Sequence, residues 1–370
     1  MISNITCPDT SVSIPQKQIN YGIEILRILS MLFIIVLHVI GQGGIAGSSM
    51  VLSSQYKVSY IMLALCYCAV NCYALISGYT NCTSKFKLSR LAALWLSVVC
   101  INAFIWVCAY MLKPEWIAIF RFRNIFLPVS LNQYWNFTAY VGLMILMPAL
   151  NAAVNNIPKK QYKFMLAGMF VLFSLLPMIF KSDIFFTHQG YSMLWIILMY
   201  LTGAYFKLHF NIKIPFIKTI CFAIYILSGL ALAFHKFYKE KLLIETESPY
   251  IYFTDYYSYT SLFVIICSLA LFVLFININV KNKYINTVIS FFSKSTFGIY
   301  IIHTNLIVWV YILGNRFINL SCVPVYELAF KVILATLIIF LVCTLIERVR
   351  MLLFKVLYID RIVKFLDKVI

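Results

Sequence analysis

Acidic residues are scarce in this sequence. Its 370 residues include only 12 Asp and Glu, and charged residues of both signs make up 11% of the chain. A soluble domain carries roughly 25% charged residues, so this chain could not cover its own surface in water. Apolar residues account for 63% of the sequence. These proportions exclude an ordinary soluble domain and indicate a protein whose solvent is lipid.

Long polar segments are also missing. About 20 mainly apolar residues span a hydrocarbon core of roughly 30 Å as a helix, and ten segments reach that length. An alternating apolar and polar pattern is absent from stretches such as residues 262–275, which argues against barrel strands. We therefore predict an all-α fold, a polytopic integral membrane protein with about ten transmembrane helices. The segments are approximately 23–43, 60–80, 92–112, 135–154, 164–181, 192–208, 216–234, 258–277, 295–314 and 327–346.

The spans make up one membrane domain, residues 21–346. Residues 1–20 are polar and lack the charged-then-apolar pattern of a signal peptide, so we expect a short cytoplasmic tail. Residues 347–370 interleave basic and apolar side chains. This pattern predicts a basic amphipathic cytoplasmic tail that lies against the lipids of the inner leaflet.

Basic residues are distributed unevenly between the two sides of the predicted membrane domain. With ten spans and a cytoplasmic amino terminus, 19 of the 30 Lys and Arg residues fall on the cytoplasmic side and 9 on the outer side. Basic residues favour the cytoplasmic side, so we expect both termini in the cytoplasm. The same bias accounts for most of the net charge of +18, which therefore does not indicate nucleic-acid binding.

Paired cysteine spacings typical of zinc sites are missing. Most of the 11 cysteines lie inside apolar segments, and Cys66, Cys68 and Cys72 share one predicted helix. We interpret them as small apolar residues in a packed helix and predict no metal site.

The first predicted span carries three ionisable residues, Glu24, Arg27 and His38. Such groups are costly inside a membrane and often functional. Glu24 and Arg27 are three residues apart and so adjacent on a helix. Arg27 and His38 are separated by about three turns, which places them on one face about 16 Å apart. The alternative is that Arg27 extends to the lipid headgroups and that His38 forms a hydrogen bond with a neighbouring helix. An unperturbed pKa of about 6.5 suits histidine for general-base catalysis.

Further polar residues cluster at the ends of other spans. The second span ends with Ser77 and Tyr79, and the basic loop after it contains Lys87 and Arg90. Basic side chains at this position can bind phosphates, although plain flanking charge is the alternative. Trp135 begins the fourth span. The ninth span contains further polar side chains, among them Tyr300 and His303.

Together these segments resemble the acyltransferase-3 family of membrane O-acyltransferases, which modify bacterial surface polysaccharides and related carbohydrates. The resemblance covers most of the chain in the family's order. One departure is Lys87, where many relatives carry arginine. The segments that carry it are residues 22–27 (GIEILR) with His38 beyond them, residues 76–79 (ISGY), Lys87 and Arg90, Tyr134 and Trp135 with residues 139–143 (AYVGL) and Pro148, and residues 296–303 (TFGIYIIH).

The resemblance implies an enzyme of the bacterial cytoplasmic membrane. Its donor would be a cytoplasmic acyl-coenzyme A, most often acetyl-coenzyme A, used as a co-substrate with no bound cofactor. Arg27, Lys87 and Arg90 would bind the donor phosphates, and His38 would take the proton from a hydroxyl of a polysaccharide or of its lipid-linked precursor. The oligomeric state stays open. Residues expected to bind the acceptor or support the site are Glu24, Ser77, Tyr79, Trp135, Tyr300 and His303.

Two other functions remain open from the residues alone. The first is a transporter or flippase of a glycan or lipid-linked intermediate, although none of the 12 acids lies at the centre of a predicted span, where proton-coupled transporters often place one. The second is a glycan polymerase, for which we would expect a large outer loop with arginines. The tyrosine-rich outer segment 245–259 fits an interfacial aromatic belt, with sugar stacking as the alternative.

Overall fold

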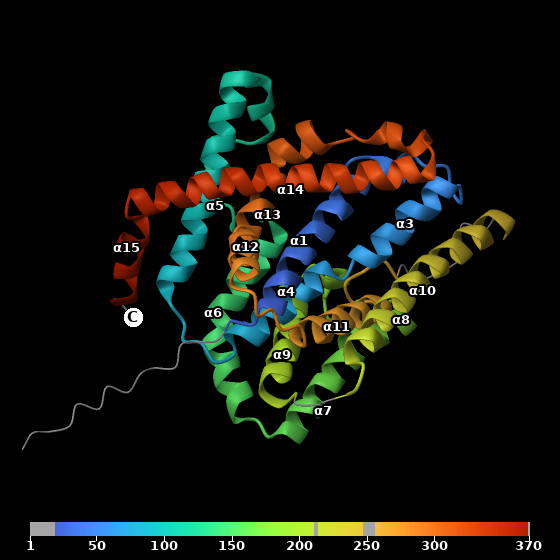
Figure 1. The fold of residues 1–370 in the computed structure, drawn as a ribbon, viewed down its shortest axis with the longest axis horizontal. Coiled ribbons are helices and arrows are strands. Elements are labelled where there is room, and N and C mark those ends of the chain that lie inside the picture. Colours follow the sequence, from blue (N-terminus) through green and yellow to red (C-terminus); the bar gives the residue numbers. More distant parts are fainter. Residues whose placement is uncertain (1–18, 211–213, 247–255, 369–370) are drawn as a thin grey trace, which may run out of the picture.

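The computed structural model describes residues 19–210, 214–246 and 256–368, and no strand occurs in these ranges. Figure 1 shows the arrangement of the helices. The first half of the chain contains α1 (Tyr21–Ile40), α2 (Ile45–Ser48), α3 (Ser54–Cys66), α4 (Ala69–Asn81), α5 (Leu88–Leu112), η1 (Pro114–Ile119), η2 (Phe122–Ile125), α6 (Trp135–Asn156), α7 (Lys159–Phe170), η3 (Val171–Leu175) and α8 (Leu176–Phe180). The second half contains η4 (His188–Gly190), α9 (Met193–His209), α10 (Ile217–Thr246), α11 (Leu262–Ile276), α12 (Lys283–Ser293), α13 (Thr296–His303), η5 (Val308–Leu313), η6 (Ile318–Cys322), α14 (Val325–Val356), α15 (Ile359–Lys364) and η7 (Phe365–Lys368).

The helices confirm the predicted fold class. Within the described residues, eight helical segments are long and apolar enough to cross a membrane, and α9 and α11 are shorter apolar helices. Each of the ten predicted segments overlaps one of them. The protein is therefore an all-α, multi-pass membrane protein.

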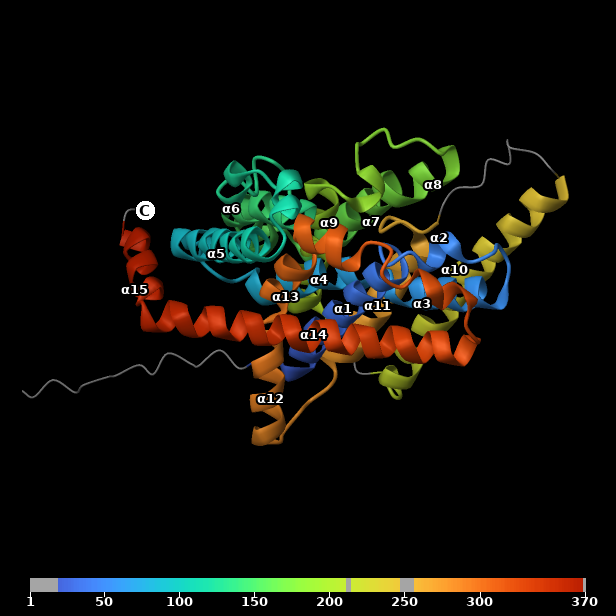
Figure 2. The same ribbon diagram turned by 90° about the horizontal axis from the view of Figure 1, so that it is seen from above.

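Helix α1 lies at the centre of the bundle. It contacts α3, α4, α11, α12, α13 and α14. Figures 1 and 2 both place α1 and α4 between α14 on one side and α6 and α7 on the other. Because other helices surround α1, its polar side chains face protein or a cavity and not only lipid.

Small residues let α4 and α9 approach closely. A Cβ atom on Gly78 would lie 1.8 Å from the carbonyl oxygen of Tyr200, and one on Gly203 would lie 2.1 Å from that of Leu75. Close backbone contact at small residues is typical of helices that pack within membranes. Close packing of α4 and α9 therefore requires glycine at Gly78, the residue after Ser77 in the segment ISGY.

The second predicted span is two helices, because the chain breaks at Tyr67 and Cys68 between α3 and α4. A break in a membrane helix is tolerated where the freed backbone groups find other partners. Here the hydroxyl of Tyr225 donates to the carbonyl of Leu65 at 3.0 Å. Tertiary contacts with α10 therefore make the break possible.

The ninth segment begins earlier than predicted. It consists of α12 and α13, and His303 is the last residue of α13 instead of lying in the middle of a span. The chain continues through η5, a wide helical turn at Val308–Leu313. The histidine thus sits where the regular helix ends.

Helix α14 continues past the predicted end of the last span to Val356. Glu347, which we expected at the start of the tail, is 2% exposed. Its carboxylate accepts two hydrogen bonds from Arg350, from Nε at 2.7 Å and from Nη2 at 2.6 Å. It also packs against Gly298 of α13, where an added Cβ would lie 2.2 Å from the Glu347 carboxylate. The chain turns away only at α15.

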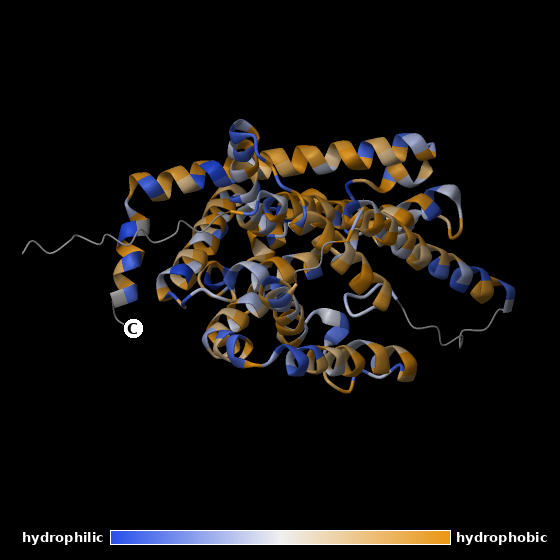
Figure 3. Cartoon of the chain, turned by 60° about the horizontal axis from the view of Figure 1, so that its bottom comes forward, coloured by the Kyte–Doolittle hydropathy of each residue, from blue (hydrophilic) through white to orange (hydrophobic). Residues whose placement is uncertain are grey.

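The outer faces of the helices are apolar. On α14, Leu341, Val342 and Leu345 are 49%, 49% and 64% exposed. Figure 3 shows hydrophobic residues along the middle of α14 and hydrophilic residues toward its junction with α15. An extended exposed apolar surface of this kind is the surface that lipid covers.

Candidate active site

One large cavity of about 2370 Å³ lies within the bundle, lined by residues of α1, α3, α4, α6, α9 and α13 among others. Beyond the first turn, the α1 residues that line it recur every three or four positions, as the residues of one helical face do. They are Glu24, Arg27, Met31, Ile34, Leu37 and His38, and Tyr21 and Ile23 of the first turn line it as well. Arg27 and His38 therefore share a face of α1, and that face borders the cavity.

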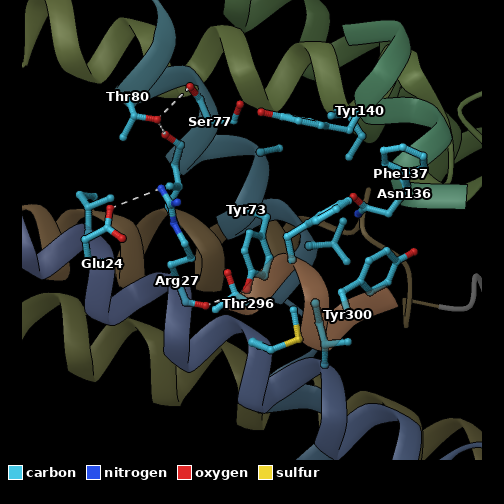
Figure 4. A pocket seen from close by; sticks show the side chains of 18 of the residues that line it. Glu24, Arg27, Tyr73, Ser77, Thr80, Asn136, Phe137, Tyr140, Thr296 and Tyr300 are labelled. Atoms are coloured by element: carbon cyan, nitrogen blue, oxygen red, sulfur yellow. Dashed lines mark hydrogen bonds and ion pairs between the residues drawn. The ribbon is translucent and has the colours of Figure 1, made fainter. Parts of the chain in front are cut away.

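Arg27 extends from α1 toward α4, where Figure 4 shows it beside Glu24 and Thr80. Its Nη2 atom lies 3.5 Å from a carboxylate oxygen of Glu24. The hydroxyl of Tyr73 donates to the backbone carbonyl of Arg27 at 2.8 Å. Among the described residues, the buried Nε of Arg27 has no hydrogen-bond partner. Buried donors are nearly always paired, so this N–H is available to a ligand acceptor.

Three more basic residues line the same end of the cavity: Arg90, Lys207 and Lys281. Arg90 is oriented by a hydrogen bond from Nη1 to the Asn81 side-chain oxygen at 3.2 Å. The Nζ of Lys207 lies 5.0 Å from the ring centroid of Tyr79, within the range of a cation–π contact. This end of the cavity is suited to an anionic ligand.

Lys207 and Lys281 were not among the predicted site residues. In the sequence they look like ordinary flanking charges, because they follow apolar segments at positions where basic residues are common. Only the packing of α9 against α4 and of α11 against α1 brings them to the cavity. Asn286 of α12 also lines this end, and its buried side-chain oxygen has no partner among the described residues.

At the other end of the cavity, His38 meets His303. The Nδ1 of His38 lies 3.0 Å from the Nε2 of His303, and the His303 Nδ1 lies 2.6 Å from the carbonyl oxygen of Ile299. The rings of Trp309 and His38 form a T-shaped contact, with centroids 4.7 Å apart. His303 is 1% exposed and does not line the cavity, whereas His38 does. The two histidines therefore have different access to a ligand.

Aromatic side chains line the cavity beyond this histidine pair. Trp135 lies 4.6 Å from Tyr191 and 5.9 Å from Tyr259 between ring centroids. Tyr67 continues the group at 5.1 Å from Tyr259, and Tyr60 also lines the cavity. We call Tyr60, Tyr67, Trp135, Tyr191 and Tyr259 the aromatic wall. Tyr250, Tyr252 and Phe253 of the tyrosine-rich segment lie outside the described residues.

Eight of the ten predicted site residues line this one cavity. They are Glu24, Arg27, His38, Ser77, Tyr79, Arg90, Trp135 and Tyr300. The exceptions are His303, which contacts His38 from behind, and Lys87. Lys87 is exposed, precedes α5 and is not among the lining residues.

No group of three or more His, Cys, Asp or Glu side chains in the described part of the chain has the arrangement of a metal site. Cys66, Cys68 and Cys72 are buried free cysteines around the break between α3 and α4.

Comparison with known proteins identifies the family. The model of the acyltransferase domain of the acyltransferase-3 family matches residues 20–348, nearly the whole chain. Searches of curated proteins and of solved structures give no match. The matched range contains α1, the basic end of the cavity and both histidines. The chain belongs to the acyltransferase-3 family, and it is a membrane acyltransferase.

Proposed function

We propose that the protein transfers an acyl group, in the expected case acetyl, from cytoplasmic acyl-coenzyme A to a hydroxyl of a cell-surface polysaccharide or of its lipid-linked precursor. The observation that carries this proposal is that Arg27 and His38 line one continuous cavity. Basic side chains stand at one end and an imidazole at the other. The protein would lie in a bacterial cytoplasmic membrane, with both termini and the basic end of the cavity on the cytoplasmic side.

The basic end fits the phosphates of coenzyme A. Arg27, Arg90, Lys207 and Lys281 supply positive charge there, and Arg27 has an unused buried N–H. Charge-assisted hydrogen bonds from arginine to phosphate are among the strongest in proteins. The free side-chain oxygen of Asn286 adds an acceptor for an N–H of the nucleotide. With its phosphates held here, the donor would extend its pantetheine arm along α1 toward His38.

At the histidine end, His38 would act as the general base. It accepts the proton of the acceptor hydroxyl as the oxygen attacks the thioester carbonyl. The C–O bond forms, the C–S bond breaks, and the departing thiolate takes the proton back from His38. The products are the ester and coenzyme A thiol. A well-placed general base contributes about 10² to 10⁴ in rate.

The acceptor would lie against the aromatic wall. Trp135, Tyr191 and Tyr259 present apolar ring faces together with hydroxyl or indole N–H groups. Such rings suit a ligand whose surface has both apolar and polar parts. A sugar presents C–H groups on one face and hydroxyls at its edge. The wall and His38 line the same cavity, so a hydroxyl of a bound sugar could reach the imidazole.

The test is to incubate the purified protein with acetyl-coenzyme A, with and without a panel of glycans, and to measure free thiol. We expect glycan-dependent thiol release by the wild type. His38→Gln should abolish it, because the amide fills a similar space but cannot accept the proton. His209→Gln is the matched control, since His209 ends α9 and does not line the cavity. Near-normal transfer by His38→Gln would contradict the assigned role of His38. Absence of thiol release from bound donor with every glycan would contradict the proposed reaction.

A further inference from the structure

We infer that His303 is a positioning residue that holds His38 in the one tautomer able to act as a base toward the cavity. The inference rests on the proposed function for its catalytic meaning. The arrangement of protons follows from the contacts of the two rings alone.

The position of the protons is set first at Ile299. Its backbone carbonyl lies 2.6 Å from the Nδ1 of His303. A carbonyl oxygen can only accept, so the Nδ1 of His303 carries the proton in this bond. A neutral imidazole has one protonated nitrogen. The Nε2 of neutral His303 is therefore an acceptor.

The second ring is fixed by the first. The Nε2 of His303 lies 3.0 Å from the Nδ1 of His38. Because that Nε2 accepts, the Nδ1 of His38 must donate. The proton of neutral His38 is thus on Nδ1, and its Nε2 keeps a free lone pair. His38 borders the cavity while His303 is buried behind it, so the lone pair belongs to the ring that a substrate can reach.

The residues next to His303 are buried and hydrogen-bonded. His303 itself is buried at the last turn of α13, and two residues later Asn305 is 0% exposed. The Asn305 amide donates to the Asn102 side-chain oxygen and to the Tyr134 hydroxyl, each at 3.1 Å. Trp309 then packs against His38 itself. The end of α13 is therefore anchored to α5 and to the start of α6, and the acceptor nitrogen has a fixed place.

The same contact assists the reaction. When the Nε2 of His38 takes the hydroxyl proton, the ring becomes positively charged, and its Nδ1–H remains hydrogen-bonded to the His303 nitrogen. Hydrogen bonds from a charged donor are about twice as strong as neutral ones, so this bond strengthens as the charge develops. His303 does not touch the substrate. It acts by orienting His38 and stabilising its charged form.

The first test reads the tautomer directly. Nitrogen-15 NMR of histidine-labelled protein separates protonated from unprotonated ring nitrogens, with the signal of His38 assigned by its loss in His38→Gln. We expect the resting wild type to show His38 protonated on Nδ1 and bare on Nε2, the less common tautomer of free histidine. A resting His38 protonated on Nε2 would overturn the inference. This measurement needs neither activity nor a His303 variant, so its failure is distinct from failure of the proposed function.

The second test compares two substitutions of His303 in the thiol-release assay. His303→Gln places an amide oxygen near the lost Nε2 and restores an acceptor, whereas His303→Leu removes it. We expect His303→Leu to lower kcat by about 10²-fold with the donor KM unchanged, and His303→Gln to recover at least part of that loss. His209→Leu controls for loss of a histidine elsewhere. Equal kcat in wild type and His303→Leu would overturn the role. So would equal losses in both variants, provided that both match the wild type in abundance and thermal stability.

Discussion

The carboxylate of Asp367, three residues from the C-terminus, accepts hydrogen bonds from Ser89 at the start of α5. The backbone N–H of Ser89 donates at 2.9 Å and its hydroxyl donates at 2.7 Å. The first N–H groups of a helix have no partner within the helix, and Lys87 at the N-cap position provides none through its side chain. The C-terminal segment therefore caps a helix at Ser89, 278 residues earlier in the chain.

This cap should depend on pH. The bonds from the Ser89 hydroxyl and then from its backbone N–H lower the pKa of Asp367 below its usual value. A carboxylate with a lowered folded-state pKa stabilises the fold above the unfolded pKa of about 3.9 and loses that effect as pH falls through the folded pKa. We expect the tail to become protease-sensitive in that acid range, and Asp367→Asn to be sensitive already at neutral pH.

The control for the cap is Ser89→Ala, which removes the hydroxyl bond but keeps the backbone bond. Its tail should have an intermediate sensitivity to protease. A tail that stays equally resistant in Asp367→Asn would show that other contacts of α15 hold it in place.

Arg27→Ala should weaken binding of acetyl-coenzyme A by about tenfold or more, because a hydrogen bond to a charged group contributes roughly 1.5–3 kcal/mol. Arg27→Lys should recover only part of the affinity, since an ammonium cannot form the paired contacts of a guanidinium. Equilibrium binding of the donor to purified protein measures both. Glu24→Gln controls for loss of the ion pair with Arg27, and unchanged affinity in a folded Arg27→Ala protein would refute the assignment.

Lys207 and Lys87 form a matched pair of tests for the path of the donor. Lys207 lines the cavity and Lys87 does not, so Lys207→Ala should raise the donor KM by about tenfold, while Lys87→Ala should change it by less than about twofold. The sequence-based hypothesis that Lys87 binds phosphate predicts a large effect of Lys87→Ala instead. Steady-state kinetics at two salt concentrations separates the two hypotheses. A donor contact with the exposed Lys87 would weaken most as the salt concentration rises, because salt screens exposed charges most.

Gly78→Ala should destabilise the bundle by roughly 1–3 kcal/mol, the usual range for overpacking. The added methyl would lie against the carbonyl of Tyr200, and helix backbone can yield only by moving α4 from α9. Gly168→Ala on α7 is the control, because nothing lies within 4 Å of its added Cβ. Thermal unfolding in detergent should show a lower Tm for Gly78→Ala alone. Equal Tm values would mean that the contact between α4 and α9 is looser than described.

The uneven distribution of basic residues predicts the orientation in the membrane. Reporter fusions at Lys87, Lys160 and Lys283 should report the cytoplasm, and a fusion near Glu247 should report the outer side. An outer location for the fusion at Lys87 would place the basic end of the cavity in a compartment without acyl-coenzyme A, which would contradict the proposed donor site as well as the topology.

The sequence by itself determined the class of fold and that Arg27 and His38 share one face of α1. Ten apolar segments of membrane-spanning length require helices, because lipid offers no partner to the backbone. The relation between Arg27 and His38 also needed no tertiary structure. Both residues lie on one helix, and the fixed rotation per residue decides that they share a face.

Only the tertiary structure decided which side chains meet that face. His303 is 265 positions from His38 in the chain, and nothing local to α13 indicates that its Nε2 points at the other ring. Lys207 and Lys281 look like flanking charges until α9 packs against α4 and α11 against α1. Glu347 looks like the start of a surface tail until α14 continues past it and Arg350 pairs with it. Helical periodicity acts over a few turns, whereas these contacts join distant segments. Their geometry depends on how the side chains of whole helices pack together.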